Sequence, residues 1–414
     1  MRFIHTSDWH LGQTLHNFER GFEHQCFLDW LLDTLVAERA DALLVSGDVF
    51  DTANPSAAAQ KQFYRFLQQA KARVPQLTSV IIAGNHDSPG RLEAPGPLLE
   101  TMDATVVGFV PRSPDGHIDV QRLVIPLKNQ QGDVTAWVLA VPFLRPGDVP
   151  RVEASTDPYQ DGIALLYAQA QALAQQLRQP GQALIAMGHC HMVGGQVSGD
   201  SERSIVIGGS EALSSGLFDA QVAYAALGHL HLAQRVGGQN QLRYCGSPLP
   251  LSFAEVAYPH QVLRVDLVGD AVSAITPLLV PRAVELLRVP AQPAPLPAVL
   301  AALKALNLPA QADPQRQPYL EVRVRLDAPE PGLRSQIEAA LAPHAVRLAK
   351  IETSFAASPS APSAAAHTSL DALEQLQPGA VFDQLYRSKY NTDTPAALGA
   401  AFAELLLADD AGAA

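Results

Sequence analysis

Cysteine is scarce in this chain of 414 residues. Its three cysteines, Cys26, Cys190 and Cys245, are an odd number and include no closely spaced pair. They therefore form no disulfide framework, and none is placed as a thiolate ligand of a metal. A chain that does without disulfides suits a reducing compartment. We expect a cytoplasmic protein.

Long hydrophobic runs are also missing. Apolar stretches such as 134–144 are far too short to span a bilayer. The first residue, Met1, leads directly into an apolar strand-like run, with no room ahead of it for a cleavable signal sequence. The sequence therefore predicts a protein that works inside the cell and makes no membrane contact.

Positive charge is the third shortage. The chain has 29 lysines and arginines against 41 aspartates and glutamates, which gives a formal net charge of -12. Proteins that bind duplex DNA unaided draw most of their affinity from Lys and Arg side chains that meet phosphates. A free-standing duplex binder is therefore disfavoured. A nucleic-acid substrate would need bound metal ions, local basic loops or a partner protein.

Apolar residues, in contrast, make up 47% of the chain, and the length favours one large domain with smaller ones beside it. Residues 1–275 alternate short apolar, partly β-branched runs with helical patterns, of which 25–37 and 57–72 are the clearest. Many strands with interspersed helices predict an α/β domain in which two stacked sheets are flanked by helices.

Residues 281–352 follow a different pattern of strand, helix, strand, helix and strand. Apolar and charged side chains alternate over 320–326, as in a strand with one buried face, and 296–306 and 333–341 have helical periodicity. We predict a small α+β domain without catalytic residues.

The C-terminal part begins with a predicted linker, 353–367, in which 356–366 contains only Ala, Ser and Pro. Residues 368–414 are predicted to form short amphipathic helices, one of which presents Leu398, Phe402, Leu405 and Leu406 on a single face. These helices could pack back on the large domain. We favour the alternative that they dock on another protein.

Five polar signatures each follow a strand-like run in the first domain. Alone, each could be an ordinary turn or strand-to-loop junction. Because the carboxyl ends of strands meet at one edge of a sheet, we expect their side chains to converge. Together, and in this order, they predict a phosphoesterase centre with two metal ions. The signatures contain Asp8 and His10, Asp48 and Asp51, Asn85 to Asp87, His189, and His229 with His231.

Two divalent ions about 3.5–4 Å apart need a carboxylate that can bridge them, and Asp48 is the natural candidate. Mixed imidazole, carboxylate and amide ligands suit Mn²⁺, Fe²⁺ or Zn²⁺ better than Mg²⁺ or Ca²⁺. Two further histidines receive structural interpretations. His191 is expected to support the site without binding metal, and His5 is expected to pack in the core.

Four segments, 7–12, 47–52, 84–88 and 244–253, resemble the calcineurin-like metallophosphoesterase superfamily and, within it, the SbcD family of bacterial nuclease subunits. The resemblance implies a four-layer α/β sandwich with a small α+β capping domain and C-terminal helices. It also implies two metal ions, usually Mn²⁺, with Mg²⁺, Fe²⁺ and Zn²⁺ as alternatives. One ion would be held by Asp8, His10, Asp48 and His231, and the other by Asp48, Asn85, His189 and His229.

The resemblance assigns His86 a catalytic role, in which it contacts the scissile phosphate and protonates the leaving oxygen. From chemistry we expect the neighbouring Asp87 to orient the imidazole. Arg91 is interpreted as a phosphate contact, although a surface arginine explains it equally well. Asp51 stands where some relatives carry a histidine, so no second active-site histidine is expected.

The implied function is a DNA nuclease, with 3′ to 5′ exonuclease activity on duplex ends and endonuclease activity on single strands and hairpins, in DNA repair, recombination and replication. The implied partner is an SbcC-type coiled-coil ATPase, in a heterotetramer built on a homodimer of this chain. One alternative is another metallophosphoesterase, either a phosphatase or a cyclic-nucleotide phosphodiesterase. A second is a scaffold that binds DNA ends and cuts little. The additional domain argues against the first, and the complete ligand set argues against the second.

Overall fold

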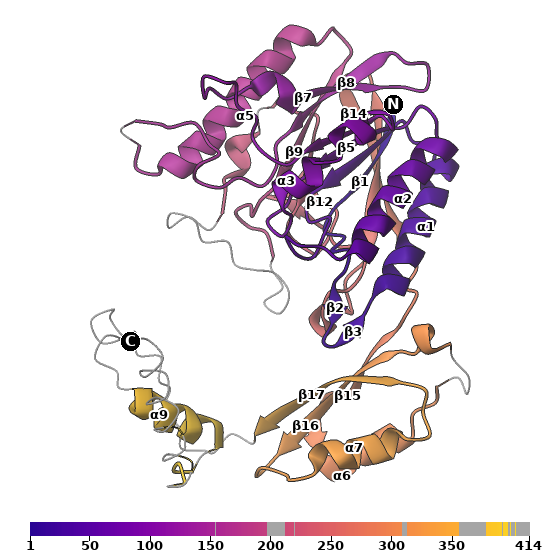
Figure 1. The fold of residues 1–414 in the computed structure, drawn as a ribbon, viewed down its shortest axis with the longest axis vertical. Coiled ribbons are helices and arrows are strands. Elements are labelled where there is room, and N and C mark those ends of the chain that lie inside the picture. The colour runs from indigo at the N-terminus through magenta and orange to yellow at the C-terminus, as the bar shows by residue number, and fades with distance from the viewer. Residues whose placement is uncertain are drawn as a thin grey trace. The chain divides into compact units, whose positions relative to one another are not determined.

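The structure is a computed structural model that describes residues 1–153, 155–196, 212–218, 220–308, 313–355, 378–390, 392–395, 398 and 402. The chain divides into two compact units, Met1–Glu285 and Leu286–Ala414, and each is considered by itself (Figure 1). No helix within the described residues is both long and apolar enough to cross a membrane.

The first unit contains two six-stranded sheets. In the first sheet, four neighbouring strands run parallel to one another. A fifth strand pairs antiparallel with this group, and the sixth pairs antiparallel with the fifth. Its strands, in spatial order, are β14 (Ala271–Leu279), β13 (Gln261–Val268), β1 (Arg2–Thr6), β4 (Ala42–Ser46), β5 (Thr78–Ile82) and β6 (Ala104–Val107).

The second sheet has four parallel central strands and an antiparallel strand at each edge. Its strands, in spatial order, are β11 (Gln234–Val236), β12 (Gln239–Tyr244), β10 (Tyr224–Gly228), β9 (Ala183–His189), β8 (Val134–Ala140) and β7 (Val124–Lys128).

The two sheets pack face to face between helical layers (Figure 1). Leu44 of β4 contributes to the core between the sheets, whereas its neighbours Leu43 and Val45 pack against the helices on the outer face. Strands that are buried on both faces read as continuous apolar runs, which is why the sequence predicts them well. The outer layers are α1 (Gly21–Ala37) and α2 (Ala57–Arg73) on one side and α5 (Pro158–Leu177) on the other. The four-layer α/β sandwich is confirmed.

Residues 286–355 of the second unit contain a three-stranded parallel sheet and the helices α6 (Leu296–Lys304) and α7 (Leu333–Leu341). Alternate residues of its central strand, among them Leu320, Val322 and Val324, share an apolar cluster with residues of the helices. In chain order, its elements are β15 (Leu286–Pro295), α6, β16 (Tyr319–Leu326), α7 and β17 (Arg347–Phe355).

Two predicted boundaries differ from the observed elements. β14 continues to Leu279, past the predicted end of the first domain at 275. β17 continues to Phe355, which pairs with Leu326 of β16, so residues 353–355 belong to the sheet and not to the linker. Hydrogen bonds to a neighbouring strand determine where these two strands end. The local amino-acid composition does not reveal that pairing. The remaining domain boundaries stay predictions.

The C-terminal segment is described only in part. Helix α9 (Pro378–Tyr390) lies within the segment 368–414, for which the sequence predicts short helices, and the ring of Phe402 stacks on Phe382 at 4.1 Å between centroids. The residues outside the description include 205–208, where the sequence predicts a further strand, the linker at 356–366, residues 368–376, where the sequence predicts the first helix of the C-terminal segment, and Leu405 and Leu406. The remaining short elements are β2 (Thr14–Leu15), β3 (Phe18–Glu19), α3 (Pro89–Glu93), α4 (Gly96–Glu100) and the 3-10 turns η1 (Val120–Leu123), η2 (Ser215–Leu217), η3 (Phe253–Glu255) and η4 (Pro314–Arg316).

The two sheets approach each other closely at a glycine. Gly228 is the last residue of β10, and a Cβ atom added there would lie 1.9 Å from the carbonyl oxygen of Ser46 at the end of β4. Only glycine allows this backbone contact between the sheets. It brings the residues that follow β10 next to those that follow β4.

We expect Gly228→Ala to lower the free energy of unfolding by about 3 kcal/mol, at the upper end for a methyl group forced into a packed interior. Urea unfolding in the presence of a chelator measures this change without a contribution from bound metal. Gly21→Ala is the matched control, because a Cβ there meets nothing within 4 Å. Equal stabilities of the two variants would contradict the proposed sheet contact.

Candidate metal centre

The predicted ligands lie at the carboxyl ends of central strands from both sheets. Asp8 and His10 follow β1, Asp48 follows β4, Asn85 follows β5, His189 ends β9, and His229 and His231 follow β10. Four of these residues have positive φ angles, namely Asp8 (55°), His10 (47°), Asp48 (49°) and His229 (103°). Residues other than glycine seldom adopt this conformation, and they do so most often at functional sites.

Backbone hydrogen bonds hold two of these strained loops together. The N–H of Asp8 donates to the carbonyl of Gly47 (3.0 Å), and that of His10 donates to the carbonyl of Asp48 (3.0 Å). The segments after β1 and β4 thus continue side by side beyond the sheet. Their side chains are thereby fixed at its edge.

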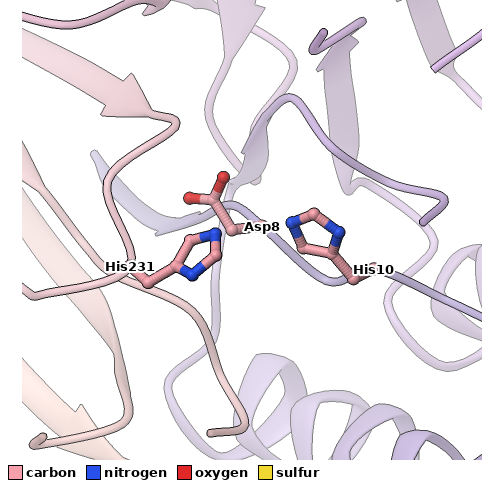
Figure 2. Close-up of side chains that lie close together, drawn as sticks. All are labelled: Asp8, His10 and His231. Carbon is pink, nitrogen blue, oxygen red and sulfur yellow. The ribbon is translucent and has the colours of Figure 1, made fainter. Parts of the chain in front are cut away.

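A first group of ligand atoms comes from Asp8, His10 and His231, all within 4.8 Å of one another and all buried (Figure 2). Nδ1 of His10 hydrogen-bonds Asp51 (3.1 Å), and Nδ1 of His231 hydrogen-bonds Glu255 (2.9 Å). A proton on Nδ1 leaves the lone pair of each ring on Nε2.

Nε2 of His10 is the strongest sign that this group fits a metal ion. That atom is buried and has no hydrogen-bond partner among the residues that the structure describes. A buried polar atom without a partner costs about 1–3 kcal/mol, which a coordinated cation would offset. The buried imidazoles and carboxylate around it are the donors that divalent transition metals take.

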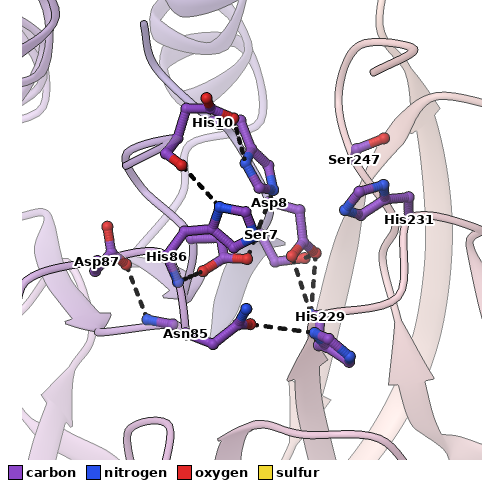
Figure 3. Close-up of polar contacts among 12 residues, drawn as sticks. Ser7, Asp8, His10, Asn85, His86, Asp87, His229, His231 and Ser247 are labelled. Atoms are coloured by element: carbon purple, nitrogen blue, oxygen red, sulfur yellow. Dashed lines mark hydrogen bonds and ion pairs between the residues drawn. The ribbon is translucent and has the colours of Figure 1, made fainter. Parts of the chain in front are cut away.

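A second group of ligand atoms comes from Asp8, Asp48 and His189. Nδ1 of His189 contacts the carbonyl of Ser46 (2.9 Å), to which it donates, so its Nε2 points the other way, towards the amide oxygen of Asn85 (2.9 Å). The same oxygen of Asn85 lies 3.2 Å from Nδ1 of His229 (Figure 3). An amide oxygen and two imidazole nitrogens thus face a common point.

Asp48 joins the two groups. Its Oδ2 lies 3.5 Å from Nε2 of His10 and 3.4 Å from Nε2 of His189, while its Oδ1 accepts the backbone N–H of His86 (2.9 Å). One carboxylate oxygen therefore faces a histidine from each group. This is the geometry that a bridging ligand needs.

The electrostatics of the centre favour positive charge. Burial alone would raise the pKa of Asp48, but His189, His10 and His86 hold that pKa well below its usual range. Burial likewise favours the neutral ring of His189, yet Asp48 and Asp8 outweigh it and raise the pKa of His189 to about 9. A divalent ion would compete with that proton for the same carboxylates.

His86 forms a third group of possible ligand atoms with His10 and Asp48, and its ring lies 4.8 Å from that of His10. Its Nδ1 contacts the backbone carbonyl of Asp51 (2.7 Å) (Figure 3). A carbonyl only accepts, so Nδ1 carries a proton and the chemistry of the ring is left to Nε2. The imidazole is thus oriented by a backbone group.

The expectation that Asp87 orients His86 stays a prediction. The buried carboxylate of Asp87 accepts three backbone N–H groups, those of Gly84 (2.8 Å), Phe50 (2.9 Å) and Val49 (3.1 Å). Burial and the nearby Asp48 raise its pKa to about 6, against the effect of those N–H groups. Asp87 therefore ties the loop after β4 to the loop after β5 and is a positioning residue.

Two other expectations stay predictions. Arg91 is an exposed residue of α3, and its contact with a phosphate is untested. His191 is half-buried, with its ring 6.5 Å from that of His229, and it belongs to none of the three metal-binding groups among the described residues.

Glu255 is a residue that the sequence analysis missed. It is fully buried, its Oε1 hydrogen-bonds His231 (2.9 Å), and its Oε2 accepts the backbone N–H of Leu251 (2.7 Å). A carboxylate behind a metal-binding histidine fixes the ring and makes it a stronger ligand. An acidic residue in the otherwise apolar stretch 249–256 was the only signal in the sequence.

Comparison with known proteins places this geometry in a family. Residues 1–233, more than half of the chain, match the model of the calcineurin-like phosphoesterases, and residues 282–390 match a model described as the type 5 capsule protein repressor C-terminal domain. The two-sheet sandwich and its cluster of buried ligands thus belong to a calcineurin-like phosphoesterase. Such enzymes bind divalent metal ions.

Relatives narrow the assignment. The SbcD component of the nuclease SbcCD from Rhodobacter capsulatus is 42% identical over 84% of this chain and 86% of its own length. The corresponding SbcCD nuclease components from Escherichia coli K12 and Bacillus subtilis are 38% and 35% identical over 68% and 64% of this chain, and over 68% and 66% of their own lengths. The chain belongs to the SbcD family of nuclease subunits.

We expect Glu255→Gln to weaken metal binding about 10- to 100-fold, the usual effect of removing the carboxylate behind a ligand histidine. A competition titration of Mn²⁺ against a chelating dye measures the affinity. Glu100→Gln, at an exposed position on α4, is the control. Unchanged affinity in a folded Glu255→Gln protein would show that Glu255 has no influence on the metal.

Proposed function

We propose that this chain cleaves DNA phosphodiester bonds at a centre of two divalent ions, with Mn²⁺ as the ion that the mixed ligands suit best. Asp8, His10, Asp48 and His231 would hold one ion, and Asp48, Asn85, His189 and His229 the other. The observation that carries the proposal is the position of Oδ2 of Asp48 between Nε2 of His10 and Nε2 of His189.

When bound, the two ions supply an activated water and neutralise charge on the non-bridging phosphate oxygens. The chain contributes the rest. His86 follows the ligand Asn85 directly, and its Nδ1 is anchored on the carbonyl of Asp51. The proton at its Nε2 would pass to the departing sugar oxygen. Asp87 keeps this loop in place through its hydrogen bonds to three backbone N–H groups.

The relatives support DNA as the substrate, because the proteins that match most of this chain are named as nucleases. We infer 3′ to 5′ exonuclease activity on duplex ends and endonuclease activity on single strands and hairpins, in repair, recombination and replication in the cytoplasm. A phosphatase or cyclic-nucleotide phosphodiesterase could use the same metals. The match outside the phosphoesterase domain, over residues 282–390, favours the nuclease.

The name of these relatives also supports a partner, since each is one component of an SbcCD complex. We infer a homodimer of this chain that assembles with an SbcC-type coiled-coil ATPase. In the described part of the tail, Leu385 and Leu398 are exposed, and they line a hollow together with Phe382, Tyr386, Lys389 and Tyr390. This apolar surface is our candidate for the docking site.

Digestion of a labelled DNA hairpin tests the proposed function. With Mn²⁺ we expect cleavage that a chelator abolishes. We also expect Asp48→Ala to retain neither ion and to cut no faster than background, because the shared ligand is lost. Hydrolysis of phosphomonoesters without cleavage of DNA would favour a phosphatase. Two tightly held ions in the Asp48→Ala protein would refute the bridging role.

A substitution of His86 separates chemistry from metal binding. We expect His86→Gln to keep both ions but to lose at least about 10²-fold in the rate of cleavage, the low end for removal of a general acid. Metal content by elemental analysis and turnover on single-stranded DNA are the two measurements. Near-normal turnover would exclude the proposed role.

Deletion of residues 368–414 tests the docking segment. We expect the truncated chain to lose co-purification with the ATPase and ATP-dependent duplex cutting, while it keeps metal-dependent cleavage of short single strands. If the tail instead stabilises the first unit, thermal stability and all activities should fall together. Retained binding to the ATPase would end the docking proposal.

A further inference from the structure

A short segment after β8 lies beside the metal centre without supplying a ligand. The backbone N–H of Phe143 donates to the carbonyl of Ala83 (2.8 Å), the residue just before Gly84 and Asn85. The half-buried ring of Phe143 meets the imidazole of His189 edge-on, with 6.3 Å between centroids. An aromatic side chain thus adjoins a proposed ligand of the second ion.

Arg145 extends this arrangement towards solvent. Its side chain is exposed, and its guanidinium carbon lies 5.3 Å from the centroid of the Phe143 ring. No carboxylate in the described part of the chain forms an ion pair with this guanidinium. The guanidinium is thus a cationic group beside Phe143, in a protein whose formal net charge is -12.

The segment is held rigidly. The backbone N–H of Arg145 donates to the carboxylate of Asp148 (2.8 Å), and the N–H of Asp148 donates back to the carbonyl of Arg145 (2.8 Å). The hydroxyl of Tyr159 donates to the carbonyl of Leu144 (2.7 Å). A site that is fixed before the ligand arrives loses less entropy on binding.

The space around Phe143 limits what can bind. A cavity of about 40 Å³ lies between Phe143, Tyr159, His189 and His191, with room for a few water molecules at most. A nucleobase therefore cannot enter behind the ring. It can stack on the exposed part of Phe143, because proteins bind single strands on aromatic rings flanked by cationic groups.

We infer that Phe143 and Arg145 grip a single-stranded nucleotide next to the scissile phosphate, with the base stacked on Phe143 and a neighbouring phosphate against Arg145. This inference rests on the proposed nuclease function. It supplies a local cationic contact of the kind that an acidic protein needs to hold DNA. It also predicts a preference for strands whose bases are unstacked.

Binding of a fluorescent oligothymidine to the full chain in a chelator is the first test. We expect Phe143→Leu to weaken binding of the oligothymidine about tenfold, the effect of one lost stacking contact. The same variant should bind an abasic strand of equal length with the affinity of the wild type. Arg145→Gln should weaken both strands and reduce the slope of log Kd against log salt by about 0.7, the value for one phosphate. The controls are Phe109→Leu and Arg65→Gln at exposed positions.

Turnover is the second test. The two substrates are single-stranded DNA and bis-p-nitrophenyl phosphate, which has no base. In both variants we expect the rate of DNA cleavage relative to that of bis-p-nitrophenyl phosphate hydrolysis to fall at least about tenfold, mainly through a higher KM for DNA. Equal losses on both substrates, or loss of bound metal, would mean that Phe143 only packs against His189 and would overturn the inference. The inference would also be overturned if the wild type cuts DNA and the two variants bind and cut it as well as their control variants do. A wild type that neither binds nor cuts DNA would instead refute the proposed function.

Discussion

The centre of this protein depends on a buried negative charge. Asp48 lies in the interior between two sheets, where an uncompensated carboxylate is very costly. Histidines from both sheets surround it, His10 on one side and His189 on the other. The need to neutralise this carboxylate makes the site a binding place for cations and couples the two sheets.

The fold provides the means for this arrangement. Parallel strands of both sheets end at one edge, and Gly228 lets the backbones approach there. The ligand loops adopt strained conformations at Asp8, His10, Asp48 and His229, and their hydrogen bonds to neighbouring backbone groups offset the strain. Behind the ligands, Asp51, Glu255 and the carbonyl of Ser46 fix the rings of three histidines.

Much of this was predictable from the sequence, for a physical reason. Strands buried on both faces are apolar throughout, so their ends are visible where the polar signatures begin, and parallel strand ends must converge. The three groups of ligand atoms, two of which contain Asp48, follow from that rule. The helices at 57–72 and 333–341 were equally clear, because one apolar face repeats at helical spacing.

What the sequence did not reveal has a physical reason as well. The carboxylate of Asp87 accepts backbone N–H groups from two loops, which its position after His86 does not indicate. Glu255 reaches His231 only because the chain folds back after β12, a contact between distant segments that no local pattern records. The position of α9 within the predicted helical segment was not specified, because its polar residues weaken the apolar repeat.

The most direct measurement is anomalous X-ray scattering from crystals of the protein loaded with Mn²⁺. We expect two peaks about 3.5–4 Å apart, with Asp48 as a ligand of both ions, His10 and His231 on one side and His189 and His229 on the other. A single peak, or two ions that do not share Asp48, would contradict the account.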